Sequence, residues 1–399
     1  MEYTLDTADK TTKLIWLPFF LQISLLLNIV LMYFGIKYVY VICYLIGFVF
    51  LLGKFHSSLN VFFYLRIAYL LVTVAVSALQ LIVLPGSSIS FVLIGLMTYL
   101  LAPFFWLLLS LRVDDPADFF KKLVFKLRYI VAGASLLGIY QYFYSPTLWG
   151  VLSQIESRQL VWATDGDFWD YSAFMRATSL WCSPQICGLF LALYIVAFFS
   201  FFKKDWKFFL FITPMFACGI LTSNKSFLLN MMFLFFIKLK FRLLFKIIIF
   251  LLAILVATSV VKLLPDHALS RMLSLERILT EEVEEGERVS IYRDSIAETS
   301  FLGNGVGGKQ SRSDQPQADV AESMLLQILN ELGVIPFLLF LLIMARQFFC
   351  CSYEMKLLVF LACLSTIYVH AFSSIHMFLF YAVLFLDLSK KNIVKSGQI

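Results

Sequence analysis

Charged residues are scarce in this sequence. Asp, Glu, Lys and Arg make up 15% of the 399 residues, whereas hydrophobic residues make up 61%. Soluble domains carry roughly 25% charged residues. The scarcity excludes an ordinary soluble domain, and it makes the few polar segments the places to look for function.

Several common site motifs are also missing. The seven Cys and four His residues show no spacing typical of a zinc site. The glycine-rich GNGVGG of residues 303–308 has no strand before it and no helix after it, as a dinucleotide fingerprint requires. The two halves of the chain show no internal repeat of the kind found in many transporters. We therefore expect no metal and no cofactor.

Long apolar runs are abundant, and each run of about 20 residues can cross a ~30 Å hydrocarbon layer. The sequence predicts an all-α polytopic membrane protein, residues 1–399 forming a single integral membrane domain with about twelve transmembrane helices. The predicted helices cover residues 14–34, 36–53, 61–84, 89–111, 122–145, 177–202, 207–222, 225–240, 244–263, 323–349, 356–376 and 377–389.

Basic residues indicate the sidedness of these helices. With both termini in the cytoplasm, about two thirds of the 32 Lys and Arg residues lie on the cytoplasmic side, as the positive-inside rule requires. The net charge of +6 is then mainly a property of that face, where it suits anionic lipids. We expect the lipid bilayer as a partner and no nucleic acid.

Two large loops face the opposite side. Residues 146–176 are rich in Trp, Asp and Ser, and residues 264–322 form a long acidic loop. The second loop is predicted to be partly helical, since Val289, Tyr292 and Ile296 share one helical face. Long loops with such internal order are usually functional.

Basic residues in and beside these loops are candidates for anion binding. Arg288 and Arg293 diverge by about 140° on a helix, so only one is expected to point at a ligand. Arg176 precedes a span interrupted at Ser183-Pro184, and Lys225 stands at another outer helix end. The alternatives are surface salt bridges for the loop arginines, and snorkelling to the interface for Arg176 and Lys225.

Two carboxylates lie where the long loop re-enters the membrane. Glu322, at the water boundary, is a candidate general base, and favourable charge at a helix N-terminus is the alternative. Glu331 lies deeper and is expected to pair inside the bundle with a polar neighbour such as Gln327 or Asn330.

Four segments in this order resemble the O-antigen polymerase and ligase superfamily of bacterial inner membranes. They are RATSLWCSPQICG, TSNKS, RVSIYRDSIAETSFLGNGVGG and AESMLLQILNELGVI, and the resemblance covers mainly residues 170–345. Ligases characteristically have a histidine where this chain has Glu322. This departure favours a polymerase.

The resemblance implies a metal-independent glycosyltransferase of the inner membrane, with both termini cytoplasmic and the active site periplasmic. Its donor and acceptor would be glycans linked to undecaprenyl pyrophosphate, and a chain-length regulator is a possible protein partner. Arg176, Arg288 and Glu322 would be catalytic. The substrate-binding residues would be Lys225, Tyr292, Arg293, Trp162 and Trp169, with the tryptophans stacking on sugars.

Two alternatives remain open at this point. The first is a ligase that transfers finished glycan to the lipid A-core. The second is a twelve-helix transporter or flippase of lipid-linked sugars, which would need charged residues near the middle of the membrane. In this sequence the charges gather instead at the ends of the predicted spans.

The predicted sidedness places Ser311, in the long loop, outside the cytoplasm. In intact cells, Ser311→Cys should react with a membrane-impermeant maleimide, whereas Lys203→Cys should react only after the membrane is broken. The unsubstituted chain gives the background from the native cysteines. Protection of Ser311→Cys in intact cells would contradict the topology.

Overall fold

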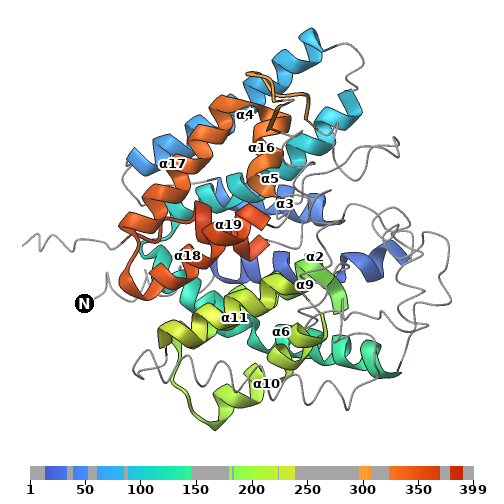
Figure 1. Cartoon of the computed structure of the whole chain (residues 1–399), viewed down its shortest axis with the longest axis vertical. Helices are drawn as coiled ribbons and strands as arrows, with labels where there is room; N and C mark the ends of the chain where they lie inside the picture. The colour runs from blue at the N-terminus through green and yellow to red at the C-terminus, as the bar shows by residue number, and fades with distance from the viewer. Residues whose placement is uncertain are drawn as a thin grey trace, which may run out of the picture.

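The computed structural model describes residues 14–33, 39–52, 61–84, 89–144, 179–181, 184–222, 224–238, 296–297, 299–306, 323–368 and 378–389. These residues form twelve α-helices and a 3-10 turn, η2 (Ser179–Trp181) (Figure 1). The helices are α2 (Trp16–Tyr33), α3 (Val39–Leu51), α4 (Val61–Val83), α5 (Ile89–Arg112), α6 (Pro116–Tyr144), α9 (Pro184–Phe201), α10 (Trp206–Leu221), α11 (Lys225–Lys238), α16 (Met324–Leu332), α17 (Val334–Cys350), α18 (Tyr353–Tyr368) and α19 (Phe378–Phe385).

The prediction of an all-α protein is confirmed for the part of the chain that the structure describes. These residues form no β-strand, and their one bridge of that kind is an isolated antiparallel pair, Cys351 with Ser389. The predicted helix over residues 244–263 and the two loops, 146–176 and 264–322, lie wholly or largely outside the described residues.

The helices form two groups with α18 and α19 between them (Figure 1). In one group α4 packs against α5 and α17, and α5 also packs against α3. In the other, α9 packs against α6, α10 and α11. Helix α18 contacts members of both groups, and α19 contacts α5, α9 and α17.

Helix α19 is the centre of the core. All eight of its residues are buried, which fits a sequence, FLFYAVLF, that is apolar on every side. The backbone carbonyl of Phe378 accepts a hydrogen bond from Trp106 Nε1 at 2.8 Å, and the two rings lie 4.5 Å apart. Helix α19 thereby ties α5 to the middle of the bundle.

A buried cation connects the other end of α19 to α4. Arg66 is 1% exposed, and its guanidinium lies 3.8 Å from the centre of the Phe62 ring. It donates hydrogen bonds to the carbonyls of Phe62 and Phe385, and it lies 4.0 Å from the carboxylate of Asp387. These acceptors satisfy a charge that would otherwise be costly to bury.

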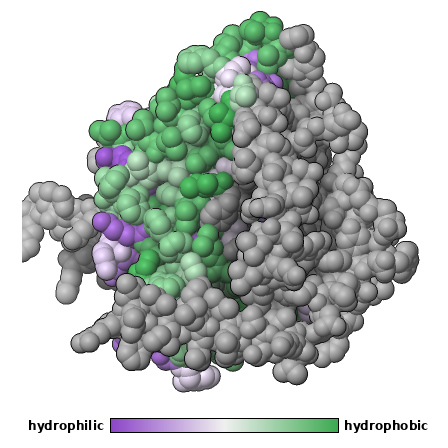
Figure 2. All heavy atoms as spheres, in the orientation of Figure 1, coloured by the Kyte–Doolittle hydropathy of each residue, from purple (hydrophilic) through white to green (hydrophobic). Residues whose placement is uncertain are grey.

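The outside of the bundle is apolar over much of its area. Exposed side chains include Val49 on α3, Leu71 and Ile82 on α4, and Leu338 and Leu342 on α17. Figure 2 shows this apolar face over α4 and α17. Such a continuous apolar surface is unusual on soluble monomers and is typical of contact with another apolar phase.

Three helical segments are long and apolar enough to cross a membrane: Val61–Val83, Gly95–Arg112 and Pro116–Tyr142. Six further apolar helical segments are shorter, with 10–17 residues each: Trp16–Leu27, Val39–Leu51, Gln185–Phe201, Trp206–Leu221, Ser226–Ile237 and Val334–Cys350. The count of twelve spans stays a prediction.

One predicted helix, residues 323–349, is two helices in the structure. Helix α16 ends at Leu332 and α17 begins at Val334, because Gly333 has a φ of 82°. That left-handed backbone interrupts the helical hydrogen bonds, and glycine adopts it without steric cost. Residues 177–202, predicted as one span interrupted at Ser183-Pro184, contain η2 and then α9, which begins at Pro184.

The helix predicted over residues 122–145 begins earlier, at Pro116. The carboxylate of Asp115 accepts a hydrogen bond from the backbone N–H of Asp118 at 3.0 Å, and proline is favoured in the first turn of a helix. Asp115 and Pro116 therefore mark the start of the helix. A prediction from the hydrophobicity of the span alone does not detect this start.

Candidate functional site

Residues 299–306, the described part of the glycine-rich segment, lie against the break between α16 and α17. The backbone N–H of Val334 donates to the carbonyl of Phe301 at 3.1 Å, and the N–H of Asn304 donates to the carbonyl of Asn330 at 2.6 Å. The hydroxyl of Thr299 donates to Asn330 Oδ1 at 2.7 Å. The loop segment thus satisfies backbone groups that the break leaves open.

Two glycines make this close approach possible. Gly303 has a φ of 78°, and a Cβ there would lie closer than 3.0 Å to the carbonyl of Glu331. A Cβ on Gly333 would likewise lie closer than 3.0 Å to the carbonyl of Phe301. Glycine permits such contacts because it has no Cβ and adopts a positive φ without steric cost. At Gly303, the group that approaches is the backbone of α16.

Gln80, near the end of α4, holds the two parts together. Its Nε2 donates to the carbonyls of Leu302 at 2.5 Å and Glu331 at 2.7 Å, and its Oε1 accepts from the N–H of Val306 at 3.1 Å. The side chain is 1% exposed. Gln80 is not among the site residues predicted from the sequence. Its signal is a lone glutamine in the apolar run VSALQLIVL, because a polar residue in a span usually has a specific partner.

Glu331 lies in the same buried region. Its Oε1 accepts a hydrogen bond from Gln327 Nε2 at 3.2 Å, and its Oε2 accepts one from the Tyr99 hydroxyl at 2.9 Å. The predicted pairing of Glu331 with Gln327 is confirmed. Asn330, the other partner considered, bonds instead to the loop segment. The carboxylate of Glu331 is thus held on both oxygens inside the bundle.

A second pair of motifs meets at the start of α9 and α11. Asn224 Nδ2 donates to the carbonyl of Gln185 at 2.7 Å, and Asn224 Oδ1 accepts from the N–H of Ser226 at 2.8 Å. A Cβ on Gly188 would lie 2.7 Å from atoms of Asn224 and 2.8 Å from Thr222. The turn TSNKS therefore packs directly onto the helix that follows the Ser-Pro break.

Helix α18 connects the two pairs of motifs. Asn230 on α11 donates to the hydroxyl of Ser365 at 3.4 Å, and the hydroxyl of Ser323 lies 3.4 Å from the carbonyl of Thr366. Ser323 also caps α16 by accepting from the N–H of Leu326. The N-cap of α16 and the second turn of α11 thus lie beside the last turn of α18. Helix N-termini carry partial positive charge.

Most of the predicted site residues lie outside the described residues. They are Trp162, Trp169, Arg176, Arg288, Tyr292, Arg293 and Glu322. Lys225 is the first residue of α11, and its side chain is also outside the description. Among the described residues, no group of three or more His, Cys, Asp or Glu side chains could hold a metal ion. What the structure brings together are the described parts of the four motifs in two pairs, each next to α18.

Comparisons of the whole chain with protein-family models, with curated proteins and with solved structures find no match.

The contacts of Gln80 predict what its loss would do. In Gln80→Leu, the carbonyls of Leu302 and Glu331 and the N–H of Val306 lose a buried partner, and each such orphan costs about 1–3 kcal/mol. We expect a lower unfolding temperature in detergent. We also expect faster amide hydrogen exchange in a peptide covering residues 299–306, because its anchor is gone.

Gln347→Leu is the matched control. Gln347 is equally buried and bonds the carbonyls of Val383 and Leu386, away from the loop segment. This variant should lose similar stability while leaving exchange at residues 299–306 unchanged. Equal exchange in both variants would show that Gln80 acts only on global stability.

Proposed function

We propose that the protein polymerises oligosaccharide repeat units linked to undecaprenyl pyrophosphate, as in the synthesis of O-antigen or a related surface polysaccharide. The reaction would take place at the periplasmic face of a bacterial inner membrane. One observation carries the proposal: the described parts of the four motifs that resemble the polymerase and ligase superfamily pack in two pairs, and α18 contacts both pairs. One pair lies at the start of α9 and α11, and the other lies at the break between α16 and α17.

Contacts between helix ends agree with the predicted grouping of those ends. Gln80, near the outer end of the predicted span 61–84, bonds to residues 302 and 306 of the outer loop. Gln185, near the outer end of the predicted span 177–202, bonds to Asn224 of the next outer turn. Lys121 and Glu354, predicted on the cytoplasmic side, form an ion pair at 2.5 Å. In the proposal, the six shorter apolar segments and the predicted helices over residues 244–263, 356–376 and 377–389 complete the set of twelve spans.

The chemistry follows from the residue types assigned to the site. A hydroxyl of the acceptor sugar attacks the anomeric carbon of the donor glycan, and the bond from that carbon to the pyrophosphate oxygen breaks. Arg176 and Arg288 balance the charge that develops on the departing lipid pyrophosphate, which the planar guanidinium can bind through two oxygens at once. Glu322 takes the proton of the attacking hydroxyl.

The described residues supply the rigid support for this chemistry. Ser323, the N-cap of α16, directly follows Glu322 in the sequence. Residues 299–306 follow Arg288 and Arg293 in the sequence and are anchored to α4 and α16. Lys225 begins α11 beside the start of α9, where it can add charge for the pyrophosphate. The apolar outer face offers room for the two long lipid tails of donor and acceptor (Figure 2).

The glycan on cells that lack the protein tests the proposed function. A polymerase predicts that the deletion strain carries a single repeat unit on the lipid core, because attachment continues without polymerisation. Expression of the wild-type chain should restore the long polymer. A core with no repeat unit would instead indicate a ligase, and failure to export the repeat unit would indicate a flippase.

Glu322→Gln tests the assigned base. Glutamine keeps the size of glutamate and removes its basic oxygen, so polymer formation per folded molecule should fall on the order of 10²–10⁴-fold. Binding of the lipid-linked donor should change little, because the arginines hold the pyrophosphate. Normal polymer per folded molecule would remove Glu322 from the mechanism.

A further inference from the structure

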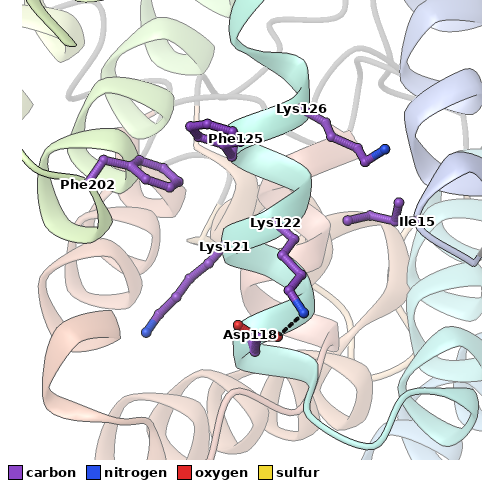
Figure 3. Close-up of a pocket in the computed structure, with 7 residues that line it drawn as sticks. All are labelled: Ile15, Asp118, Lys121, Lys122, Phe125, Lys126 and Phe202. Atoms are coloured by element: carbon purple, nitrogen blue, oxygen red, sulfur yellow. Dashed lines mark ion pairs between the residues drawn. The ribbon is translucent and has the colours of Figure 1, made fainter. Parts of the chain in front are cut away.

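A groove beside Phe202, just after α9, lies outside the proposed catalytic region, which includes the start of α9 at Gln185. It encloses 410 Å³ along the first turns of α6 and is open on one side. Its lining comes from α6, from the start of α2 and from the end of α9. The lining residues are Ile15, Asp118, Lys121, Lys122, Phe125, Lys126 and Phe202 (Figure 3).

The rim of the groove is basic. Lys122 pairs with Asp118 at 2.7 Å, and Lys121 pairs with Glu354 of α18 at 2.5 Å. Lys126 forms no ion pair within the described part of the chain, and its Nζ lies 3.5 Å from the centre of the Trp16 ring. Arg128 adds a guanidinium 3.5 Å from the Phe125 ring. The cations outnumber the carboxylates, so the rim favours an anion.

The wall of the groove is apolar. Phe125 on α6 and Phe202 after α9 lie with their ring centres 5.2 Å apart (Figure 3). Phe125 and Trp16 are 45% and 43% exposed, respectively. Exposed aromatic rings beside lysines are typical of the boundary between hydrocarbon and headgroups in a membrane.

The length of α6 puts the lysines at that boundary. Its 29 residues extend about 43 Å, which exceeds the ~30 Å hydrocarbon layer by about two turns. The basic residues all lie in the first half of the helix, and the second half, from Ile130 to Tyr144, carries no charge. The first turns therefore extend into the headgroup layer when the rest of α6 crosses the membrane.

We propose that this groove binds one anionic phospholipid. Its headgroup phosphate contacts Lys122 and Lys126, and one acyl chain lies along Phe125 and Phe202. This inference rests on the membrane placement of α6 and is independent of the polymerase activity. The site would give the bundle a fixed lipid where α2, α6 and α18 come together, since Lys121 already connects α6 to α18.

Native mass spectrometry of the purified full chain in detergent measures the binding. Phosphatidylglycerol is the anionic probe and phosphatidylcholine is the zwitterionic reference. The wild type should retain one phosphatidylglycerol with at least fivefold preference over phosphatidylcholine. Lys122→Gln/Lys126→Gln should reduce that preference to twofold or less, since each juxtamembrane lysine is worth about fivefold.

The matched control is Lys204→Gln/Lys207→Gln, which removes one exposed lysine between α9 and α10 and one in the first turn of α10, both outside the groove lining. It should retain the wild-type preference.

Equal losses in the two double variants would overturn the proposal in favour of diffuse attraction, and so would a wild type with no preference. Displacement of the lipid by millimolar glycerol 3-phosphate would also overturn it, because a headgroup alone would then suffice. Each variant must keep the wild-type melting temperature without added lipid, and a variant that loses it is replaced by Lys126→Gln alone.

Discussion

A helix that breaks inside an apolar environment must find new partners for its backbone, and this constraint shapes the candidate site. Hydrocarbon offers no hydrogen bonds, so a break is tolerated only where other parts of the protein supply them. At the Gly333 break, the carbonyl of Phe301 accepts from the N–H of Val334, and the side chain of Gln80 donates to the carbonyl of Glu331. Gln80 also bonds to backbone groups of residues 302 and 306. The position of the loop segment is therefore fixed by the same bonds that satisfy the broken helix.

The helices could be predicted from sequence because a long apolar run indicates a helix in apolar surroundings. The pairing of Glu331 with Gln327 could be predicted as well, since residues four apart on a helix are neighbours. The break at Gly333 could not, because a glycine in an apolar run fits both a continuous helix and an interrupted one. The true start of α6 depends on a local cap at Asp115, and hydropathy carries no information about caps.

The motifs of the candidate site were visible in the sequence, but their pairing was not. Gln80 bonds to groups 222 and 251 residues away in the chain, and no local pattern encodes such a distance. Similarly, TSNKS and the residues after Ser183-Pro184 meet through Asn224 and Gly188. Order along the chain suggested a common site. The hydrogen bonds of the described residues give a physical reason why the segments of each pair lie together.

The complete burial of α19 has a consequence for how the bundle is assembled. Its partners α5, α9 and α17 all precede it in the chain, so they are synthesised and can be inserted before it exists. Until α19 arrives, α18 alone lies between the two groups of helices, and Trp106 lacks its contact with Phe378. Maturation would then be a post-insertion step in which the two groups close around a late segment. An incomplete chain ending before Phe378 would carry an unfilled centre, which quality-control proteases can recognise.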